Sequence, residues 1–315
     1  MSFFLLRRTG GLVLTLLAIS IVVFAVMNVL PGDPALTILG IDATDDARAA
    51  LRVQLGLDDP APVRYVQWIA GIARGDFGTS YSFGVPVAGL IAERLPLTLS
   101  LALSGTLLTL VIALAAGLYS ASRHGRTGDW AVMILSQLGI AIPAFWLAIL
   151  LVLLFAVNLR WFPPGGFPGW SDPLGSLRSL VLPTIALAAV QGAVLARVTR
   201  SSALEVMRLD FVRTARATGL SPARVLWRHV LPNALVPVIT IVGMQFAGVV
   251  TGTIVIENVF YLPGLGRLIF QSIANRDIIT VQALVLMVAA VVVLANFAVD
   301  VAYALIVPRL KARLA

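Results

Sequence analysis

The stretch LTLSLALSGTLLTLVIALAAGLY, residues 97–119, runs for 23 positions without a charged side chain. A helix needs about 20 mainly apolar residues to cross the hydrocarbon core of a bilayer. A helix also satisfies its own backbone hydrogen bonds, which lipid cannot do. The stretch therefore predicts a membrane-spanning helix, and the fold is expected to be that of an integral membrane protein.

The composition of the whole chain supports this prediction. Of 315 residues, 59% are apolar and 12% are charged, whereas soluble domains are about half apolar and about a quarter charged. Five more stretches are long and apolar enough to span a bilayer: 10–30, 131–157, 180–198, 234–256 and 279–307. The first of them is too long for the apolar region of a signal peptide and has no small-residue cleavage site after it. We therefore expect an all-α integral membrane fold with six transmembrane helices.

The residue types that the chain lacks exclude several functions. It has no cysteine, and its only lysine, Lys311, lies close to the C-terminal end. A nucleotide-binding P-loop needs a lysine directly after its glycines, so this chain is not expected to hold ATP itself. The two histidines, His124 and His229, have no second histidine or cysteine at metal-ligand spacing. The sequence therefore predicts no catalytic residue, no metal site and no cofactor in this chain.

The basic residues predict the orientation of the spans. If the N-terminus is cytoplasmic, 14 of the 23 basic residues fall on the cytoplasmic side, together with only three of the 15 acidic ones. Such an excess is typical of cytoplasmic loops. Nucleic-acid binding would not sort charge by side in this way. We therefore expect both termini in the cytoplasm, contact with membrane lipid, and no nucleic-acid partner.

These spans divide the chain into regions. They are a first transmembrane helix at 1–30, an external cap at 31–96, a five-helix core at 97–307 with a cytoplasmic loop at 199–233, and a cytoplasmic tail at 308–315. In the cap, Thr44 followed by two aspartates predicts the start of one short helix, and Pro62 predicts the start of another. The cap is interpreted either as a spacer or as a docking surface for an external partner.

Neutral polar residues are scattered through the spans. Four are candidates for lining a pore: Gln137, Gln191, Gln245 and Thr251. Each on its own is also explained by helix packing, because polar side chains hydrogen-bond across helices in lipid. Asp300 is the one good candidate for an ionisable residue within a span, and such a residue is typical of proton relays. It lies near the cytoplasmic end of its helix, where pairing with a nearby arginine is the alternative interpretation. A proton-coupled carrier and a membrane scaffold without transport are therefore kept as alternatives to a pore subunit.

The loop at 199–233 has a strong helical pattern. Apolar residues recur in two stripes, Leu204, Met207, Phe211 and Ala215, and then Val225, Leu226, Val230 and Leu231. Gly219 separates the stripes, and Ser221 and Pro222 have the residue types of an N-cap and a first helical position. The pattern predicts a helix–turn–helix with an arginine-rich face. Such a unit would either lie on lipid headgroups or fit as a rigid body into a partner.

This loop resembles the cytoplasmic loop of the permeases of binding-protein-dependent ABC importers. The resemblance rests on residues 210–221, DFVRTARATGLS, and 229–237, HVLPNALVP. At the positions of the general Glu-Ala-Ala pattern this chain has Arg213, Thr214 and Ala215. The first two depart from the pattern, which is a variant typical of the dipeptide, oligopeptide and nickel branch, and Gly219 matches the glycine of the pattern. Further segments resemble the same branch in order: LPGDP at 30–34, GDFGTS at 75–80, RLPLTL at 94–99, WFPPGG at 161–166, ENVFYLPGLGRL at 257–268, and Arg276 with Asp277.

The resemblance implies a fold like that of type I ABC importers and a function in the bacterial cytoplasmic (inner) membrane. This chain, of the first permease type, would form half of a pore with a second homologous permease. Two ATPase subunits, or one heterodimer, would bind ATP and magnesium, and an external binding protein would deliver the substrate. The residues that it implies for ATPase coupling are Arg213, Thr214, Ala215, Arg216, Gly219, Leu220, Ser221, His229 and Pro232. Di- or oligopeptides are the expected substrates, with nickel chelates, glutathione and cell-wall peptides as alternatives.

Overall fold

The computed structural model describes residues 2–29, 34–40, 43–54 and 56–306. These residues form helices joined by turns, without a β-strand among them. The predicted tail at 308–315 lies outside the described residues, and so does the side chain of Asp300.

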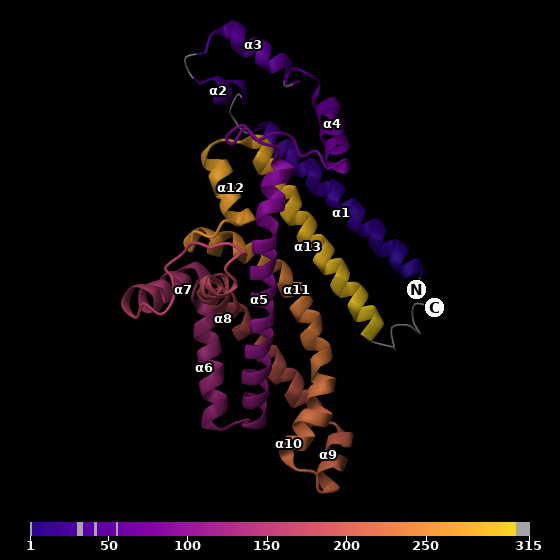
Figure 1. Ribbon diagram of the computed structural model, residues 1–315. Coiled ribbons are helices and arrows are strands. Elements are labelled where there is room, and N and C mark those ends of the chain that lie inside the picture. The colour runs from indigo at the N-terminus through magenta and orange to yellow at the C-terminus, as the bar shows by residue number, and fades with distance from the viewer. Residues whose placement is uncertain (1, 30–33, 41–42, 55, 307–315) are drawn as a thin grey trace.

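The molecule is elongated, with a group of short helices at each end (Figure 1). The cap helices at one end are α2 (Pro34–Leu39), α3 (Asp45–Gln54) and α4 (Ala61–Ala73). The opposite end carries α9 (Asp210–Ala217), α10 (Pro222–Val225) and the π-helical turn η2 (Leu226–Val230). Between them run α1 (Ser2–Val29), α5 (Val87–Ser122), α6 (Thr127–Ala141), α7 (Ala144–Leu151), the π-helical turn η1 (Val152–Asn158), α8 (Pro173–Met207), α11 (Leu231–Val259), α12 (Leu265–Ala274) and α13 (Ile278–Ile306).

Five of the predicted spans are confirmed as helices long and apolar enough to cross a membrane. Within the described residues these are Leu6–Asn28, Val87–Ser122, Pro173–Met207, Pro222–Val259 and Ile278–Val299. Most are longer than the apolar stretches predicted, because the helices continue into the groups at both ends. The prediction did not include α12, a ten-residue helix between the last two spans.

The third predicted span, 131–157, is not one straight helix. Helix α6 and the pair α7 with η1 pass the test of a span only together, and their axes differ by 101°. The break lies at Ile142, which has extended backbone angles, φ −89° and ψ 122°, directly before Pro143. Proline disfavours the helical conformation of the residue before it and has no N–H to continue the hydrogen-bond ladder. The bend sends α7 away from the bundle (Figure 1).

The two longest contacting helices of the bundle, α5 and α8, approach closely at Gly117. A Cβ on this residue would lie 2.5 Å from the Cβ of Thr199 and 2.7 Å from the carbonyl oxygen of Ala196. Small residues permit such backbone approach, which is the main source of helix association in lipid. The bundle is therefore closely packed between α5 and α8, near the end that carries α9.

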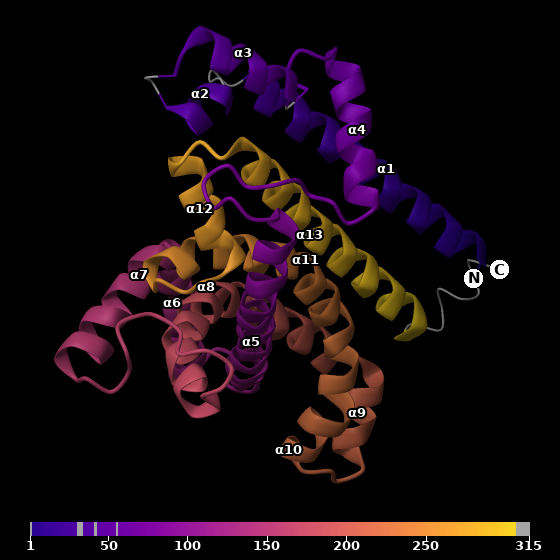
Figure 2. The ribbon, with the colours of Figure 1, turned by 45° about the horizontal axis from the view of Figure 1, so that its top comes forward.

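Helix α1 lies along α13 and joins the cap (Figure 2). The hydroxyls of Ser20 and Tyr65 are 2.7 Å apart, and the ring of Phe24 packs edge-on against Tyr65. In the cap, the Thr44 hydroxyl accepts from the Ala47 amide at 3.3 Å, so the predicted N-cap is confirmed. The first and last long helices and α4 thus form one side of the molecule.

Candidate functional site

Helix α9 is short, and its ends are defined by local hydrogen bonds. Leu209 precedes it in an extended conformation, with φ −71° and ψ 149°. At its far end Gly219 has φ +84°, and its amide donates to the Arg216 carbonyl at 3.0 Å. The next amide, Leu220, donates back to Ala215 at 3.4 Å. This pair of bonds is the Schellman ending of a helix, which places a glycine in the left-handed region.

The second helix of the loop begins as predicted. The Ser221 hydroxyl accepts from the Arg224 amide at 3.4 Å, and Pro222 occupies the first helical position. We call α9, α10 and the turn between them the knob, residues 210–225. The predicted helix–turn–helix is therefore present, with one difference: the first helix is separated from α8 by a break at Arg208 and Leu209.

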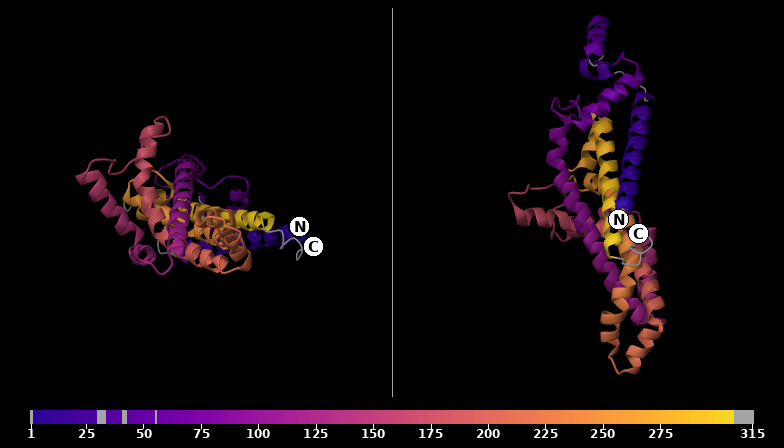
Figure 3. Two further views of the ribbon diagram at one scale, coloured as in Figure 1. Left: turned by 90° about the horizontal axis from the view of Figure 1, so that it is seen from below. Right: turned by 90° about the vertical axis from the view of Figure 1, so that its right-hand side faces the viewer.

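The knob is held to the ends of three long helices by an apolar cluster. Val212 and Ala215 of α9 are buried in it. The other buried members are Leu118 and Ala121 of α5, Ala203 and Val206 of α8, and Val225, Val230 and Ala234. Because side chains from α5, α8 and α11 all enter this cluster, the knob is fixed to the bundle and does not hang from a loose loop. Figure 3 shows it as the end of the molecule opposite the cap.

The break before α9 corrects the predicted apolar stripe. Leu204, Met207 and Ala215 pack in the cluster, but Phe211 is 42% exposed, and Val212 is buried in its place. Helical periodicity does not continue across an extended residue, so the face of α9 is rotated relative to the end of α8. The second stripe, Val225 to Leu231, packs in the cluster as predicted.

The predicted coupling residues lie together at this end of the molecule, in three kinds of place. Arg213, Thr214 and Arg216 are exposed on α9, whereas Ala215 is buried and Leu220 is half-buried against the cluster. Gly219 and Ser221 form the turn. His229 is half-buried on η2, and Pro232 is exposed in the first turn of α11. Sequence reasoning missed Trp227, which is 62% exposed close to this face.

Three of the four predicted pore residues lie where α8 meets α11. The side-chain amide nitrogen of Gln191, on α8, is 2.9 Å from the position of a Cβ on Gly248, on α11. Thr251 and Gln245 each lie about one turn from Gly248 on the same helix. The Gln245 side-chain oxygen is buried without a hydrogen-bond partner among the described residues. Thr251 is exposed and donates to Ala247 of its own helix. Gln137 lies apart, exposed on α6, where its oxygen accepts from Arg197 at 3.4 Å.

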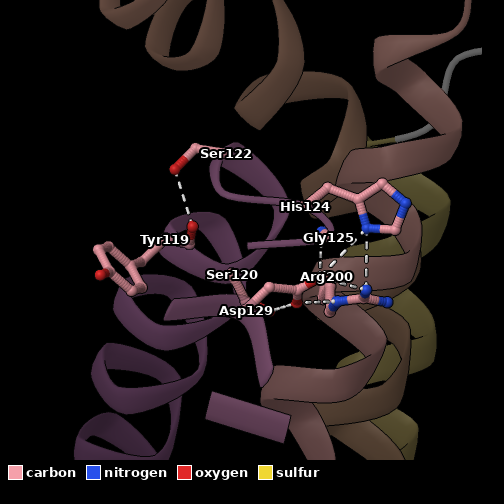
Figure 4. Close-up of polar contacts among 7 residues, drawn as sticks. All are labelled: Tyr119, Ser120, Ser122, His124, Gly125, Asp129 and Arg200. Atoms are coloured by element: carbon pink, nitrogen blue, oxygen red, sulfur yellow. Dashed lines mark hydrogen bonds and ion pairs between the residues drawn. The ribbon is translucent and has the colours of Figure 1, made fainter. Parts of the chain in front are cut away.

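A buried carboxylate that the sequence analysis counted only as a charge joins α5, α6 and α8 (Figure 4). Asp129, 3% exposed, accepts from Nε and Nη2 of Arg200 at 2.7 and 2.8 Å. It also accepts from the Ser120 hydroxyl at 2.5 Å and from the Gly125 amide at 2.9 Å. Nδ1 of His124 lies 3.2 Å from the same carboxylate. Every oxygen of Asp129 is thus paired, as a buried charge requires.

A second buried carboxylate, Glu257 near the end of α11, binds the N-terminus of helix α12. Glu257 accepts from the Thr98 hydroxyl at 2.7 Å, from the Gly266 amide at 2.7 Å and from the Arg267 amide at 3.4 Å. The Thr98 oxygen in turn accepts from the Leu265 amide at 2.9 Å. The first amides of a helix have no partner within it, so Glu257 and Thr98 together satisfy the N-terminus of α12.

A third buried carboxylate, Asp277, joins the start of α13 to the segment before α5. It accepts from the hydroxyl of Ser80 and, at 2.8 Å, from that of Thr280. The neighbouring Tyr81 has its pKa raised to about 12 by burial and by the charge of Asp277, so its hydroxyl stays neutral at physiological pH. The segments GDFGTS and Arg276-Asp277, far apart in the chain, therefore meet here.

No group of three His, Cys, Asp or Glu residues able to hold a metal ion occurs among the described residues. The polar constellations described above satisfy helix ends and tie helices together. The described residues form a helical framework with an exposed knob.

Comparisons with known proteins identify the family. Residues 113–312 match the family described as "Binding-protein-dependent transport system inner membrane component", and residues 1–102 match its N-terminal family. A putative peptide transport system permease protein of Brucella abortus (strain 2308) is 43% identical over 312 residues, 99% of each chain. The oligopeptide transport system permease protein AppB of Bacillus subtilis is 38% identical, over 99% of this chain and 100% of that protein. The glutathione transport system permease protein GsiC of Salmonella choleraesuis is 40% identical over 98% of each.

Solved structures agree on the fold. A chain of the MetNI methionine ABC transporter in an inward-facing conformation aligns with a TM-score of 0.55 at 18% identity, over 69% of this chain and 96% of that chain. Family, relatives and fold thus point the same way, to a subunit of a transporter that is not itself an enzyme. The chain belongs to the family of binding-protein-dependent transport system inner membrane components, and it is a multi-pass permease subunit of an ABC importer.

Proposed function

We propose that this chain forms half of the pore of an ATP-driven importer of di- or oligopeptides and that its knob docks into separate ATPase subunits. The observation that carries the proposal is the knob itself. It exposes Arg213, Thr214 and Arg216 at the end opposite the cap, while Val212 and Ala215 anchor it to three long helices. A rigid body fixed in this way transmits a partner's displacement to the spans, which a loose loop cannot do.

The proposed partners are those that the family resemblance implies, and the composition of this chain is compatible with them. With one lysine, near its C-terminal end, it has no P-loop. ATP and magnesium would therefore be bound by two ATPase subunits or one heterodimer. A second homologous permease would complete the pore, beside Gln191, Gln245 and Thr251, with Gln137 as a further candidate on α6. An external binding protein would deliver the substrate at the cap end.

Peptides are the proposed substrate because relatives of Brucella and Bacillus carry peptide and oligopeptide transport in their names. Glutathione, named for another relative, is itself a small peptide and is the closest alternative. Nickel chelates and cell-wall peptides are further candidates. Bare nickel is disfavoured, because the chain has no cysteine and the apolar stretches predicted as spans have no histidine, so they would offer only weaker ligands.

The function is tested by reconstituting the chain with its second permease, ATPase subunits and binding protein in liposomes. Uptake of a labelled tripeptide is expected to require ATP, magnesium and the binding protein, and to survive collapse of the proton gradient. Competition by unlabelled oligopeptides, glutathione and nickel chelates then ranks the substrates. Uptake driven by a proton gradient without ATP would instead support the proton-coupled carrier.

The proposed orientation places both chain termini and the knob in the cytoplasm. The start of α1 and the end of α13 lie on the side away from the cap, which supports this choice (Figure 1). Because the chain has no cysteine, single cysteines can report topology. At Asp59 and Asn275, both exposed at the cap end, they should react with an impermeant maleimide on intact cells.

Cysteines at Arg123 and Ala223, both exposed at the opposite end, should react with the same maleimide only after the membrane is opened. Labelling of the Ala223→Cys variant on intact cells would show that the orientation is the reverse of the proposed one. It would also place the knob beyond the reach of any cytoplasmic ATPase.

A further inference from the structure

The ion pair between Asp129 and Arg200 joins two helices that otherwise share few polar contacts. Asp129 lies in the first turn of α6, and Arg200 lies on α8, about two turns before that helix ends. The guanidinium contacts both carboxylate oxygens, at 2.7 and 2.8 Å (Figure 4). Such a bidentate ion pair fixes the relative orientation of the two side chains as well as the distance between them.

The position of α6 in the bundle makes this ion pair important for holding α6 against α8. Trp130, Ile134, Leu135 and Leu138 of α6 are more than half exposed. Lipid is as apolar as these side chains, so no hydrophobic force holds one spanning helix on another. The Ser120 hydroxyl and the Gly125 amide also donate to Asp129, which links it to α5 and to the α5–α6 turn. The polar cluster thus ties the start of α6 to α8 and to the end of α5.

The ion pair also lies next to the knob. After Arg200, α8 continues through Ala203 and Val206, and both are buried in the cluster that holds Val212 and Ala215 of α9. A displacement of the knob therefore reaches α8 directly. It reaches α5 directly as well, through Leu118 and Ala121. It reaches α6 through the packing of α6 on α5 and α8, which includes Gly139 against Ala193 and, next to the knob, the ion pair of Asp129 with Arg200.

We propose that Asp129 and Arg200 are positioning residues that make α6 move as one body with α8 when ATPase subunits displace the knob. The inference rests on the proposed function and extends it to residues outside the knob. Without the pair, the ATPases would still dock and hydrolyse ATP, but α6 would not follow α8. The measurable consequence is less uptake per ATP hydrolysed, while the subunit composition of the complex stays the same.

The first test compares uptake per ATP hydrolysed in reconstituted complexes. Asp129→Asn is expected to lower this ratio about tenfold, within the usual range of coupling between sites, with subunit composition unchanged. Arg200→Lys keeps the charge but loses the two-point geometry, and its ratio should be intermediate. The control is Ser104→Ala. The Ser104 hydroxyl is 3.0 Å from that of Thr184, so it also joins α5 to α8, but away from α6. Its ratio should equal that of the unsubstituted complex.

The second test replaces the ion pair with a covalent bond. A Cβ on Gly139 of α6 would lie 3.1 Å from the Cβ of Ala193 of α8, close to the separation of about 3.5–4.5 Å that a disulfide spans. In the Asp129→Asn background, the pair Gly139→Cys and Ala193→Cys should restore the coupling ratio when oxidised and lose it again on reduction. In the otherwise unsubstituted chain, oxidation should leave transport intact, since the two helices already move together.

Four results would overturn the inference, the last of them together with the proposed function. Uptake and ATP hydrolysis in Asp129→Asn could fall equally with the amount of assembled complex, which would make the pair a contributor to stability alone. The oxidised disulfide could fail to restore coupling. It could also stop transport in the chain that keeps Asp129, which would show that α6 and α8 must slide past each other. Absence of ATP-driven uptake by the unsubstituted complex would overturn the proposed function, and this inference with it.

Discussion

A Gly219→Val substitution is expected to abolish most peptide uptake while leaving the spans folded. Gly219 has φ +84°, and nothing lies within 4 Å of a Cβ built there. The penalty is therefore in the backbone, and for a β-branched residue in this region it is about 1–3 kcal/mol. Relief of that strain unwinds the Schellman ending, which releases Leu220 and tilts α9 against its cluster. A penalty of one to two kcal/mol lowers the docked population by a factor of about 5–30.

The measurement is ATP-driven uptake, together with the amount of ATPase that co-purifies with the permeases. Gly84→Val is the matched control, because Gly84 has φ +66°, is equally open to a side chain, and lies at the cap end. It carries the same kind of strain without touching the knob, so uptake should be near normal. Normal assembly and uptake in Gly219→Val would remove the docking role, leaving the loop as a segment on lipid headgroups.

Glu257→Ala is expected to cause the largest loss of stability of any single change considered. The substitution removes the acceptor for the Thr98 hydroxyl and the Gly266 amide, each donating at 2.7 Å in a buried site. Each buried donor left unpaired costs about 1–3 kcal/mol, so we expect a loss of about 2–6 kcal/mol. That is a large part of the stability of a typical protein, which is about 5–15 kcal/mol.

The loss should appear as a lower midpoint of thermal unfolding of the purified permease pair in detergent. Glu257→Gln keeps one acceptor oxygen and the shape of the side chain, so its effect should be smaller. Glu93→Ala, at an exposed position on α5, should leave the midpoint unchanged. Equal midpoints for Glu257→Ala and Glu93→Ala would show that α12 does not need its carboxylate cap.

The spans could be predicted from the sequence because apolar length is a local property. The position at which a span bends could not be predicted from the sequence. Pro96, Pro183 and Pro237 all lie inside continuous helices, whereas Pro143 follows a sharp break. The residue type is the same in each case, and the packing around it decides whether the helix continues. The phase shift that exposes Phe211 has the same origin, since a single extended residue, Leu209, resets the helical period.

The site was predicted in its local parts and missed in its long-range ones. Gly219 and Ser221 were identified because turn chemistry is local. The coupling role of the exposed arginines stays a prediction. The pairings of Asp129 with Arg200 and of Thr98 with Glu257 bring together residues 71 and 159 positions apart, and no periodicity reports such a contact. The family segments RLPLTL and ENVFYLPGLGRL, recognised separately in the sequence, turn out to be the two halves of one helix cap.

The packing of α1 along α13 has a consequence for how the chain is made. During synthesis the N-terminal end leaves the ribosome first, so α1 enters the membrane before any of its bundle partners exist. Its neighbour α13 is the last long helix described, and their contact spans nearly the whole sequence. Helix α1, which holds the cap helix α4 through Ser20 and Phe24, must therefore remain in lipid without this neighbour until α13 has been synthesised. A contact between segments so far apart in the chain forms late, because the loop between them must be closed first, and a chain stalled before α13 would leave α1 in the membrane without it.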